Sequence, residues 1–211
     1  MKLLKLFTLF LLISSPSLFA QQNLTDKLPV DPNVRIGKLS NGLTYYIRQN
    51  KKPGQKIELR LVVNAGSILE DDDQQRLAHL TELMAFNGTT HFKKNDIVSF
   101  LQSIGVGFGS DLNAYTSFDE TVYILPIPTD NPSNIEKGFQ ILDDWAHNVT
   151  DKASDIDEER PIVLEESRLG KGAQDRIDRK IFPLEYAGSK YAKRIPIGID
   201  SIVKNAPYDV I

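Results

Sequence analysis

Residues 77–88 read LAHLTELMAFNG, and this stretch has the pattern of an amphipathic helix. Apolar side chains recur along it mostly three or four positions apart, at Leu77, Leu80, Leu83, Met84 and Phe86. Such spacing gathers them on one side of a helix, and the Asn87-Gly88 pair that follows is a typical helix stop. His79 and Glu82 are therefore predicted to lie on one helix, three residues apart.

The segments around this helix predict further strands. Asn41-Gly42 between two apolar runs indicates a hairpin, and residues 56–66 alternate apolar and polar side chains as a half-buried strand does. Two more strands are predicted at 111–117 and 120–127. Their pairing is expected to end at the nearby prolines, which are Pro126, Pro128 and Pro132.

Helices are predicted at 95–105, 134–148 and 154–169, with Asn95 as a cap of the first. Pro161 is expected to start or kink the last helix, depending on whether Ser154 or Asp157 caps it. Beyond Gly170 the prolines suggest mostly irregular chain with short helical pieces. This order predicts an α+β fold in which an antiparallel or mixed sheet is covered by helices. Residues 35–211 are expected to form one domain, cut short of its last strands.

The N-terminus has the layout of a signal peptide. Lys2 and Lys5 precede an apolar run from Leu6 to Ile13, and Ala20 is a suitable cleavage position. A membrane anchor is the alternative, but the run is shorter than the ~20 residues that span a bilayer. Residues 1–20 are therefore predicted to be removed and 21–34 to form an extended leader. The mature protein is expected to be exported, to the periplasm of a Gram-negative bacterium or outside the cell, without a membrane attachment.

Composition narrows the possible chemistry. The 211 residues are 41% hydrophobic and 25% charged, with a net charge of −3, so no basic surface for nucleic acid is expected. The chain has no Cys, which excludes disulfides, thiolate zinc sites and cysteine nucleophiles. Any metal would be held by carboxylates and by the three histidines, which are His79, His91 and His147.

The His79-x-x-Glu82-Leu83 segment is close to an inverted zinc motif, H-x-x-E-H. In that motif the two histidines bind zinc from one face of a helix, and the glutamate is the general base. Here Leu83 stands where the second histidine would be. Taken alone, a histidine three residues from a glutamate on a helix is more often a surface pair or a capped core histidine than a metal site.

The surrounding sequence resembles the pitrilysin/insulinase family of inverzincin zinc metallopeptidases, and most closely its exported bacterial members. The likeness continues in the family's order beyond the helix, in NGTTHF at 87–92, DLNAYTSFDET at 111–121, EER at 158–160 and VLEE at 163–166. The resemblance implies a metallopeptidase-like N-terminal domain that hydrolyses peptides or unfolded chains through a zinc-activated water. It also implies a partner, because such enzymes resemble a clamshell in which a second pitrilysin-like half or subunit helps to hold the substrate.

The resemblance assigns roles to four residues. It makes His79 the first zinc ligand, Glu166 the distal carboxylate ligand, Glu82 the base, and Glu159 a further catalytic carboxylate near the site. The spacing agrees, because residues seven apart share a helix face at a rise of about 10 Å, whereas Glu165 points elsewhere. Without the His79 segment, a solvated acidic helix would be the preferred interpretation.

The segment Asn113, Ala114, Tyr115 and Thr116 resembles the edge strand on which such enzymes lay an extended substrate by main-chain pairing. Ordinary sheet structure is the alternative interpretation. His91 and His147 are expected to be structural.

Leu83 divides the functional hypotheses into two. It offers no lone pair, while a catalytic zinc normally has three protein ligands and a water. The first hypothesis is a zinc endopeptidase impaired at one ligand, binding one Zn²⁺ at reduced affinity. The second is a noncatalytic peptide-binding or partner subunit that keeps the peptidase fold. Retention of His79, Glu82, Glu159 and Glu166 favours descent from an active enzyme.

Overall fold

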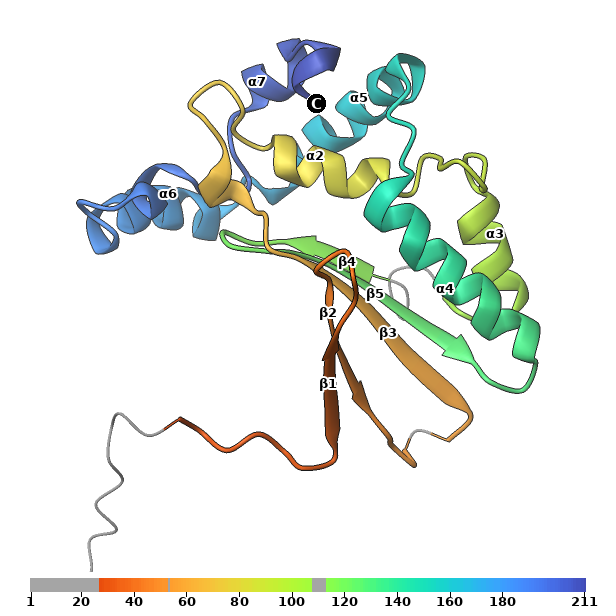
Figure 1. Cartoon of the computed structure of the whole chain (residues 1–211). Helices are drawn as coiled ribbons and strands as arrows, with labels where there is room; N and C mark the ends of the chain where they lie inside the picture. Colours follow the sequence, from red (N-terminus) through yellow and green to blue (C-terminus); the bar gives the residue numbers. More distant parts are fainter. Residues whose placement is uncertain (1–26, 53, 108–112) are drawn as a thin grey trace, which may run out of the picture. The chain divides into compact units, whose positions relative to one another are not determined.

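The computed structural model describes residues 27–52, 54–107 and 113–211, so the predicted signal peptide and the first part of the leader lie outside it. The chain divides into two compact units, Met1–Lys52 and Pro53–Ile211, which are described separately. In the first unit, β1 (Val34–Lys38) and β2 (Thr44–Arg48) pair antiparallel, as the hairpin signal predicts (Figure 1). Gly42 adopts a φ of 95°, a conformation that favours glycine.

The second unit contains a three-stranded antiparallel sheet in the order β3-β5-β4. Its strands are β3 (Lys56–Val63), β4 (Asn113–Thr116) and β5 (Thr121–Pro128). The register sets Leu59 opposite Leu125 and Thr116 opposite Thr121. The predicted α+β class is confirmed, and the sheet is antiparallel in the described part of the chain. Residues 111 and 112 of the predicted strand at 111–117 lie outside that part.

The prediction that Pro126 and Pro128 end the pairing is wrong. Both lie within β5, opposite Glu58 and Lys56 of β3. The amide of Thr129 donates to the carbonyl of Gln55, so alternate amides from this end of β5 face β3 and the proline nitrogens face the other way. Among the described residues, β4 pairs with β5 only as far as Ile124. A missing N–H on the side that faces away from β3 removes no hydrogen bond of the β3–β5 ladder, so that pairing continues past both prolines.

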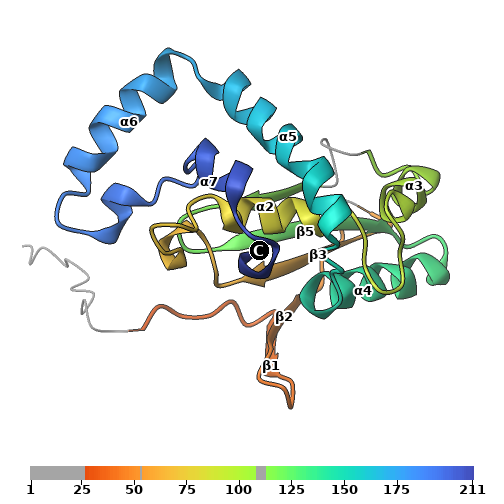
Figure 2. The same cartoon turned by 90° about the horizontal axis from the view of Figure 1, so that it is seen from above.

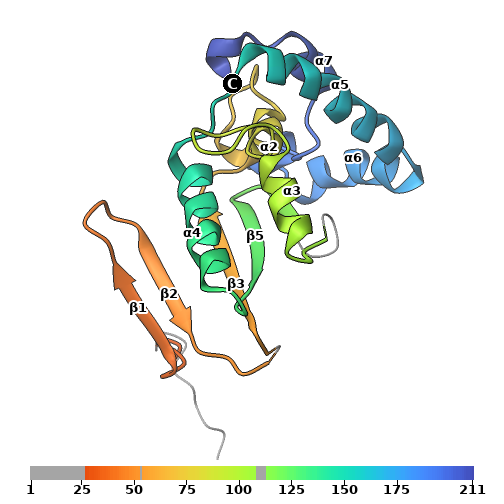
Figure 3. The same ribbon diagram turned by 90° about the vertical axis from the view of Figure 1, so that its right-hand side faces the viewer.

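Helices cover one face of the sheet and build the main core. These are α2 (Leu77–Met84), α3 (Asp96–Ser103) and α4 (Pro132–His147), and Figure 3 shows α3 and α4 running alongside β3 and β5. The buried core residues from sheet and helices are Leu59, Tyr123, Leu125, Ile127, Ala85, Ile97, Leu101, Val106, Ile141 and Trp145. Asn95 precedes α3 as predicted, but its side chain makes no capping hydrogen bond.

A second, smaller core lies on the other side of α2, where α5 (Ala153–Gly170) and α7 (Asp200–Asn205) pack against it. Its buried members are Leu77, Leu80, Val163, Val203 and Ala206. Figure 1 shows α2 between this pair of helices and the sheet. Because α5 begins at Ala153, neither Ser154 nor Asp157 caps it, and Pro161 lies inside the helix.

The expectation of mostly irregular chain beyond Gly170 is wrong for 13 residues. Helix α6 spans Ala173–Glu185, follows α5 at a sharp angle and lies to one side of the sheet (Figure 2). None of its residues is buried, yet Ile177, Ile181 and Leu184 recur at helical spacing, a signal that the prolines outweighed in the prediction. An Asp175–Arg179 pair at 2.9 Å supports the helix, and Pro183 falls in its last turn. The remaining short turns are 3-10 helices at Ser67–Leu69, Lys190–Lys193 and Tyr208–Val210.

Candidate metallopeptidase site

Helix α2 positions the candidate site because it lies between the sheet and α5. Its N-terminal amides are satisfied from outside the helix, by the carboxylate of Glu70. The Oε1 of Glu70 accepts from the amides of Arg76 at 3.0 Å and Ala78 at 2.9 Å. A carboxylate at this end also complements the helix dipole. The first turn, which carries His79, is thereby fixed in the fold.

Glu82 points from α2 toward the sheet. It is only 4% exposed, and its Oε2 accepts a 2.6 Å hydrogen bond from the Oγ1 of Thr116 on β4. Burial raises the pKa of Glu82 to about 7, with Glu166 adding to the rise and the Thr116 hydrogen bond opposing it. A carboxylate with a pKa near neutrality can both take and return a proton.

His79 and Glu166 meet across the α2–α5 interface. The Nε2 of His79 lies 3.6 Å from the Oε2 of Glu166, and the two side chains are 17% and 56% exposed. Burial lowers the pKa of His79 below its ordinary value of 6.5, partly opposed by Glu166 and assisted by Arg76. The imidazole is therefore neutral at pH 7 and keeps a lone pair on one ring nitrogen, as a metal ligand requires.

Leu83, one residue after Glu82, faces the second core. It is half-buried and packs against the cluster formed with α5 and α7. It contributes no donor atom, and among the described residues no three His, Cys, Asp or Glu side chains gather as a metal site would require. The donor set therefore fits zinc at two protein positions, His79 and Glu166, and lacks a third.

Glu159 and Glu166 both face α2, as their seven-residue spacing predicts. Glu159 is 7% exposed, and its Oε2 accepts a 2.6 Å hydrogen bond from the Nδ2 of Asn87, just beyond the end of α2. Glu165 points away and pairs with Arg168 at 2.6 Å. The described contact of Glu159 is thus with Asn87 and joins the helices, while Glu166 reaches His79.

The predicted substrate segment coincides with β4, which lies at one end of the β3-β5-β4 order. Tyr115 is 42% exposed and donates to Glu120 at 3.0 Å. Thr116 points toward Glu82 and lies 3.2 Å from the hydroxyl of Thr121. Ala114 is half-buried, and the side chain of Asn113 lies outside the described part of the structure. The strand therefore touches the α2 carboxylate through one threonine.

The other two histidines lie elsewhere. The Nδ1 of His91 is 2.7 Å from the Oδ1 of Asp144, a fully buried carboxylate that also accepts from Thr89. His147 is the last residue of α4 and lies 3.4 Å from Asp143. Neither joins His79, which agrees with the structural roles expected for them.

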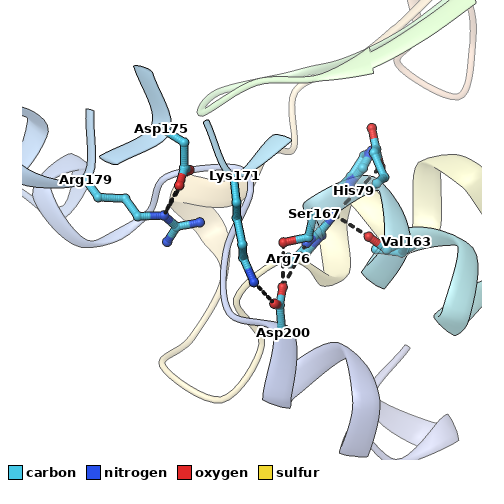
Figure 4. Close-up of polar contacts among 9 residues, drawn as sticks. Arg76, His79, Val163, Ser167, Lys171, Asp175, Arg179 and Asp200 are labelled. Carbon is cyan, nitrogen blue, oxygen red and sulfur yellow. Dashed lines mark hydrogen bonds and ion pairs between the residues drawn. The ribbon is translucent and has the colours of Figure 1, made fainter. Parts of the chain in front are cut away.

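Sequence reasoning missed Arg76 and Asp200. Arg76 is 0% exposed, and its Nη2 lies 3.7 Å from the Oε2 of Glu166. Its Nη1 lies 3.3 Å from the Oδ1 of Asp200 (Figure 4). Ser167 also donates to Asp200, at 2.7 Å. Asp200 is 124 residues from Arg76 along the chain, so no local pattern could have joined them.

Residues 45–178 match the profile of the Insulinase family, peptidase family M16. The chain belongs to this family. It is 44% identical over 204 residues to a probable zinc protease, PqqL, of Haemophilus influenzae, and 41% identical over 171 residues to a PQQL-like zinc protease of Arabidopsis thaliana. These alignments cover 95% and 81% of this chain, but 22% and 18% of the relatives. The chain thus spans about a fifth of the length of the curated relatives it matches.

The fold agrees with this assignment. The crystal structure of the first half of the periplasmic protease PqqL from Escherichia coli superposes with a TM-score of 0.83 at 34% identity, covering 87% of this chain and 39% of that one. The family and fold inferred from the sequence motifs are confirmed, and the family is one of zinc proteases. Within the described residues, no helix has the length and hydrophobicity to cross a membrane.

Proposed function

We propose that this chain is the N-terminal domain of an exported zinc endopeptidase whose metal centre lacks one ligand. The observation that carries the proposal is the convergence of three groups on α2. Glu82, the proposed base, is buried against Thr116 of β4, and His79 lies beside Glu166 of α5. Base, metal donors and substrate strand thus adjoin one another, as peptide hydrolysis requires.

His79 and Glu166 are the residues that would hold the zinc. A bound zinc supplies a Lewis acid that polarises the substrate carbonyl and lowers the pKa of water. The Leu83 position leaves one protein ligand absent. Losing a ligand should weaken binding by several kcal/mol out of the order of 10 kcal/mol or more typical of strong sites. We therefore expect zinc to be bound weakly rather than stoichiometrically at low concentration.

Glu82 is suited to move the proton of the attacking water. Its Oε2 already accepts from Thr116, so its Oε1 is the atom left to receive that proton. With a pKa of about 7 it is roughly half ionised at neutral pH. The same oxygen can return the proton to the leaving amine. Glu159 is proposed as the further carboxylate of the site, acting on α2 through Asn87.

The substrate class is proposed to be extended peptides or unfolded chains. β4 lies at an end of the described sheet, and an extended peptide can add to such a strand through main-chain hydrogen bonds. Main-chain pairing reads little sequence, so the substrate range should be broad. Residues Asn113, Ala114, Tyr115 and Thr116 would form this binding edge.

Export and assembly complete the proposal. The N-terminal pattern supports a signal peptide at 1–20, a leader at 21–34 and a metallopeptidase-like domain at 35–211. An E. coli relative is described as periplasmic, which supports the same location here. The relatives are much longer than this chain, which supports a second pitrilysin-like half or subunit as a partner.

The second candidate function is a noncatalytic peptide-binding or partner subunit. Leu83 favours it, because its side chain packs against the second core where a ligand is needed. The fold tolerates this change, since leucine is a good helix former. In that case β4 would still bind peptides, and Glu82 would serve no chemistry.

Zinc content and peptide cleavage test the two candidates together. Purified protein and its Leu83→His variant would be equilibrated with zinc, and cleavage of a fluorogenic peptide would be followed with and without Glu82→Gln. The endopeptidase proposal expects weak zinc binding and slow cleavage, both increased by Leu83→His and with cleavage lost in Glu82→Gln. Peptide binding without cleavage in both the parent protein and the Leu83→His variant would favour the noncatalytic subunit. Absence of zinc from both would overturn the metal assignment.

A further inference from the structure

Arg76 places a charged guanidinium inside the domain, behind the proposed metal donors. The residue is 0% exposed, and the Nε of its side chain has no hydrogen-bond partner. Its φ of 85° lies in the left-handed region that favours glycine. A Cβ built on Gly198 would lie 2.4 Å from the Cβ of Arg76, so the two backbones meet closely. Arg76 is therefore held in place despite a backbone cost.

The guanidinium contacts the same oxygen that faces His79. Its Nη2 donates to the carbonyl of Val163 at 2.8 Å and lies 3.7 Å from the Oε2 of Glu166. That Oε2 is also 3.6 Å from the Nε2 of His79. Figure 4 shows Arg76 between His79 and Asp200. One carboxylate oxygen thus lies between a fixed cation and the imidazole that would share a metal with it.

The charge of Arg76 is only partly offset by its neighbours. Its Nη1 lies 3.3 Å from the Oδ1 of Asp200, but the Oδ2 of Asp200 also accepts from the Nζ of Lys171 at 2.7 Å. Two cations therefore share Asp200. Glu166, the other nearby anion, is half exposed and must serve Arg76 and any metal at once. An arginine stays charged at every accessible pH, so this positive charge is permanent.

We propose that Arg76 is a resident cation that holds Glu166 in the absence of metal and competes with a divalent cation for its carboxylate. The inference rests on the metal site proposed above and adds a second cause of weak binding, independent of Leu83. A missing ligand removes a bond to the metal. Arg76 acts differently, by repelling the metal through a low-dielectric interior where like charges interact strongly.

Zinc affinity of charge-altered variants tests the proposal without any assay of activity. Zn²⁺ would be titrated into metal-free protein carrying Leu83→His, so that affinity is measurable, using a competing chromogenic chelator. Arg76→Gln should tighten binding by about tenfold or more, because it removes a buried like charge. Arg76→Lys keeps the charge and should leave the affinity within about threefold of the parent. Unchanged or weaker binding in Arg76→Gln overturns the inference.

Variants of Lys171 and of Asp200 give a second test, because they should change the zinc affinity in opposite directions. Lys171→Gln should tighten zinc binding, because it frees Asp200 to neutralise Arg76. Asp200→Asn should weaken it, because Arg76 then keeps its full charge. A merely structural network predicts weaker binding in both, and that result counts against the inference. If circular dichroism shows that Arg76→Gln does not fold, the Lys171→Gln and Asp200→Asn variants test the role of Arg76 in its place.

Failure of the inference and failure of the proposed function give different results. If Leu83→His binds zinc and the Arg76 and Lys171 variants do not tighten it, only the role of Arg76 is overturned. If Leu83→His binds zinc and the added Arg76→Gln change tightens it, both the site and the inference are supported. If neither protein binds zinc, both are overturned.

Discussion

The Oγ1 of Thr116 lies 2.6 Å from the Oε2 of Glu82 and joins the proposed substrate strand to the proposed base. The two residues are 34 positions apart in sequence and come from β4 and α2. This contact makes the pKa of a buried carboxylate depend on the strand that would bind peptide. Both the chemistry and the stability of the domain should therefore respond to changes at either residue.

Thr116→Val should raise the pKa of Glu82 further, because the hydrogen bond from Thr116 is what opposes the effect of burial. A larger protonated fraction at neutral pH leaves less base. We expect the acid limb of the pH–activity profile of the Leu83→His protein to move to higher pH, with activity at pH 6.5 reduced about fivefold, the equivalent of one hydrogen bond of about 1 kcal/mol. Thr116→Ser keeps the hydroxyl and should keep the profile. Identical profiles for valine and threonine would contradict the link.

Glu82→Gln should change how the stability of the metal-free protein depends on pH. The folded-state pKa of Glu82 is raised to about 7 from its ordinary value of 4.5, so the folded state binds the proton more tightly than the unfolded state. This carboxyl therefore favours folding fully below pH 4.5, and that contribution is lost as the pH rises through 7, by about 3 kcal/mol in all. The glutamine variant lacks this loss.

Urea denaturation from pH 4.5 to 8 measures the difference between the two proteins. The free energy of unfolding of Glu82→Gln relative to the parent should increase across this range and level off above pH 7.5. Glu165→Gln is the matched control, because that exposed glutamate on α5 pairs only with Arg168 among the described residues. A constant difference between Glu82→Gln and the parent would show that the carboxyl has no raised pKa.

Leu83→His should lower the free energy of unfolding of the metal-free protein, and added zinc should raise it again. Leu83 is half-buried against the second core, so replacing it with a polar ring should lower the free energy of unfolding by about 1–2 kcal/mol. Zinc at 100 times its dissociation constant should return about 2.7 kcal/mol through preferential binding to the folded state. Thermal melts with and without zinc measure both effects. Leu83→Gln, polar but a poor zinc ligand, should show the cost without the recovery.

Asn87→Ala should destabilise the α2–α5 interface. It leaves the carboxylate of Glu159, which is 7% exposed, without its 2.6 Å hydrogen bond. An unsatisfied buried acceptor of this kind costs about 1–3 kcal/mol, and more when it is charged. Chemical denaturation of Asn87→Ala, Glu159→Leu and the double variant forms a thermodynamic cycle. We expect the double variant to be less destabilised than the sum of the single variants, and simple additivity would count against the pairing.

The sequence specified the local elements that have strong periodicity. The spacing of Leu77, Leu80 and Met84 predicted α2, and the alternation in β3 predicted a half-buried strand, because each pattern repeats within one element. Seven-residue spacing likewise placed Glu159 and Glu166 on one face of α5. The prediction from the prolines was wrong, because the nitrogen of Pro126 faces away from β3 and removes no hydrogen bond between β3 and β5. The direction in which that nitrogen points is set by how β5 pairs with its neighbours.

Helix α6 shows the opposite difficulty. Its residues are all at least partly exposed, although Ile177, Ile181 and Leu184 recur at helical spacing. Short-range pairs such as Asp175–Arg179 support it. Pro183 suggests a break in the sequence pattern, yet it falls in the last turn. A proline there removes one terminal hydrogen bond of the helix and leaves the rest intact.

By itself, the sequence determined the family, the helix that carries His79 and Glu82, and the presence of Leu83 at the second histidine position of the motif, since all three depend on residue identity and short-range spacing. Tertiary structure alone decided what surrounds these groups. The raised pKa of Glu82 depends on its burial against Thr116, and the placement of Arg76 behind Glu166 depends on Asp200, 124 residues away. Burial and charge pairing arise from contacts between distant segments, and such contacts leave no periodic pattern in a single chain.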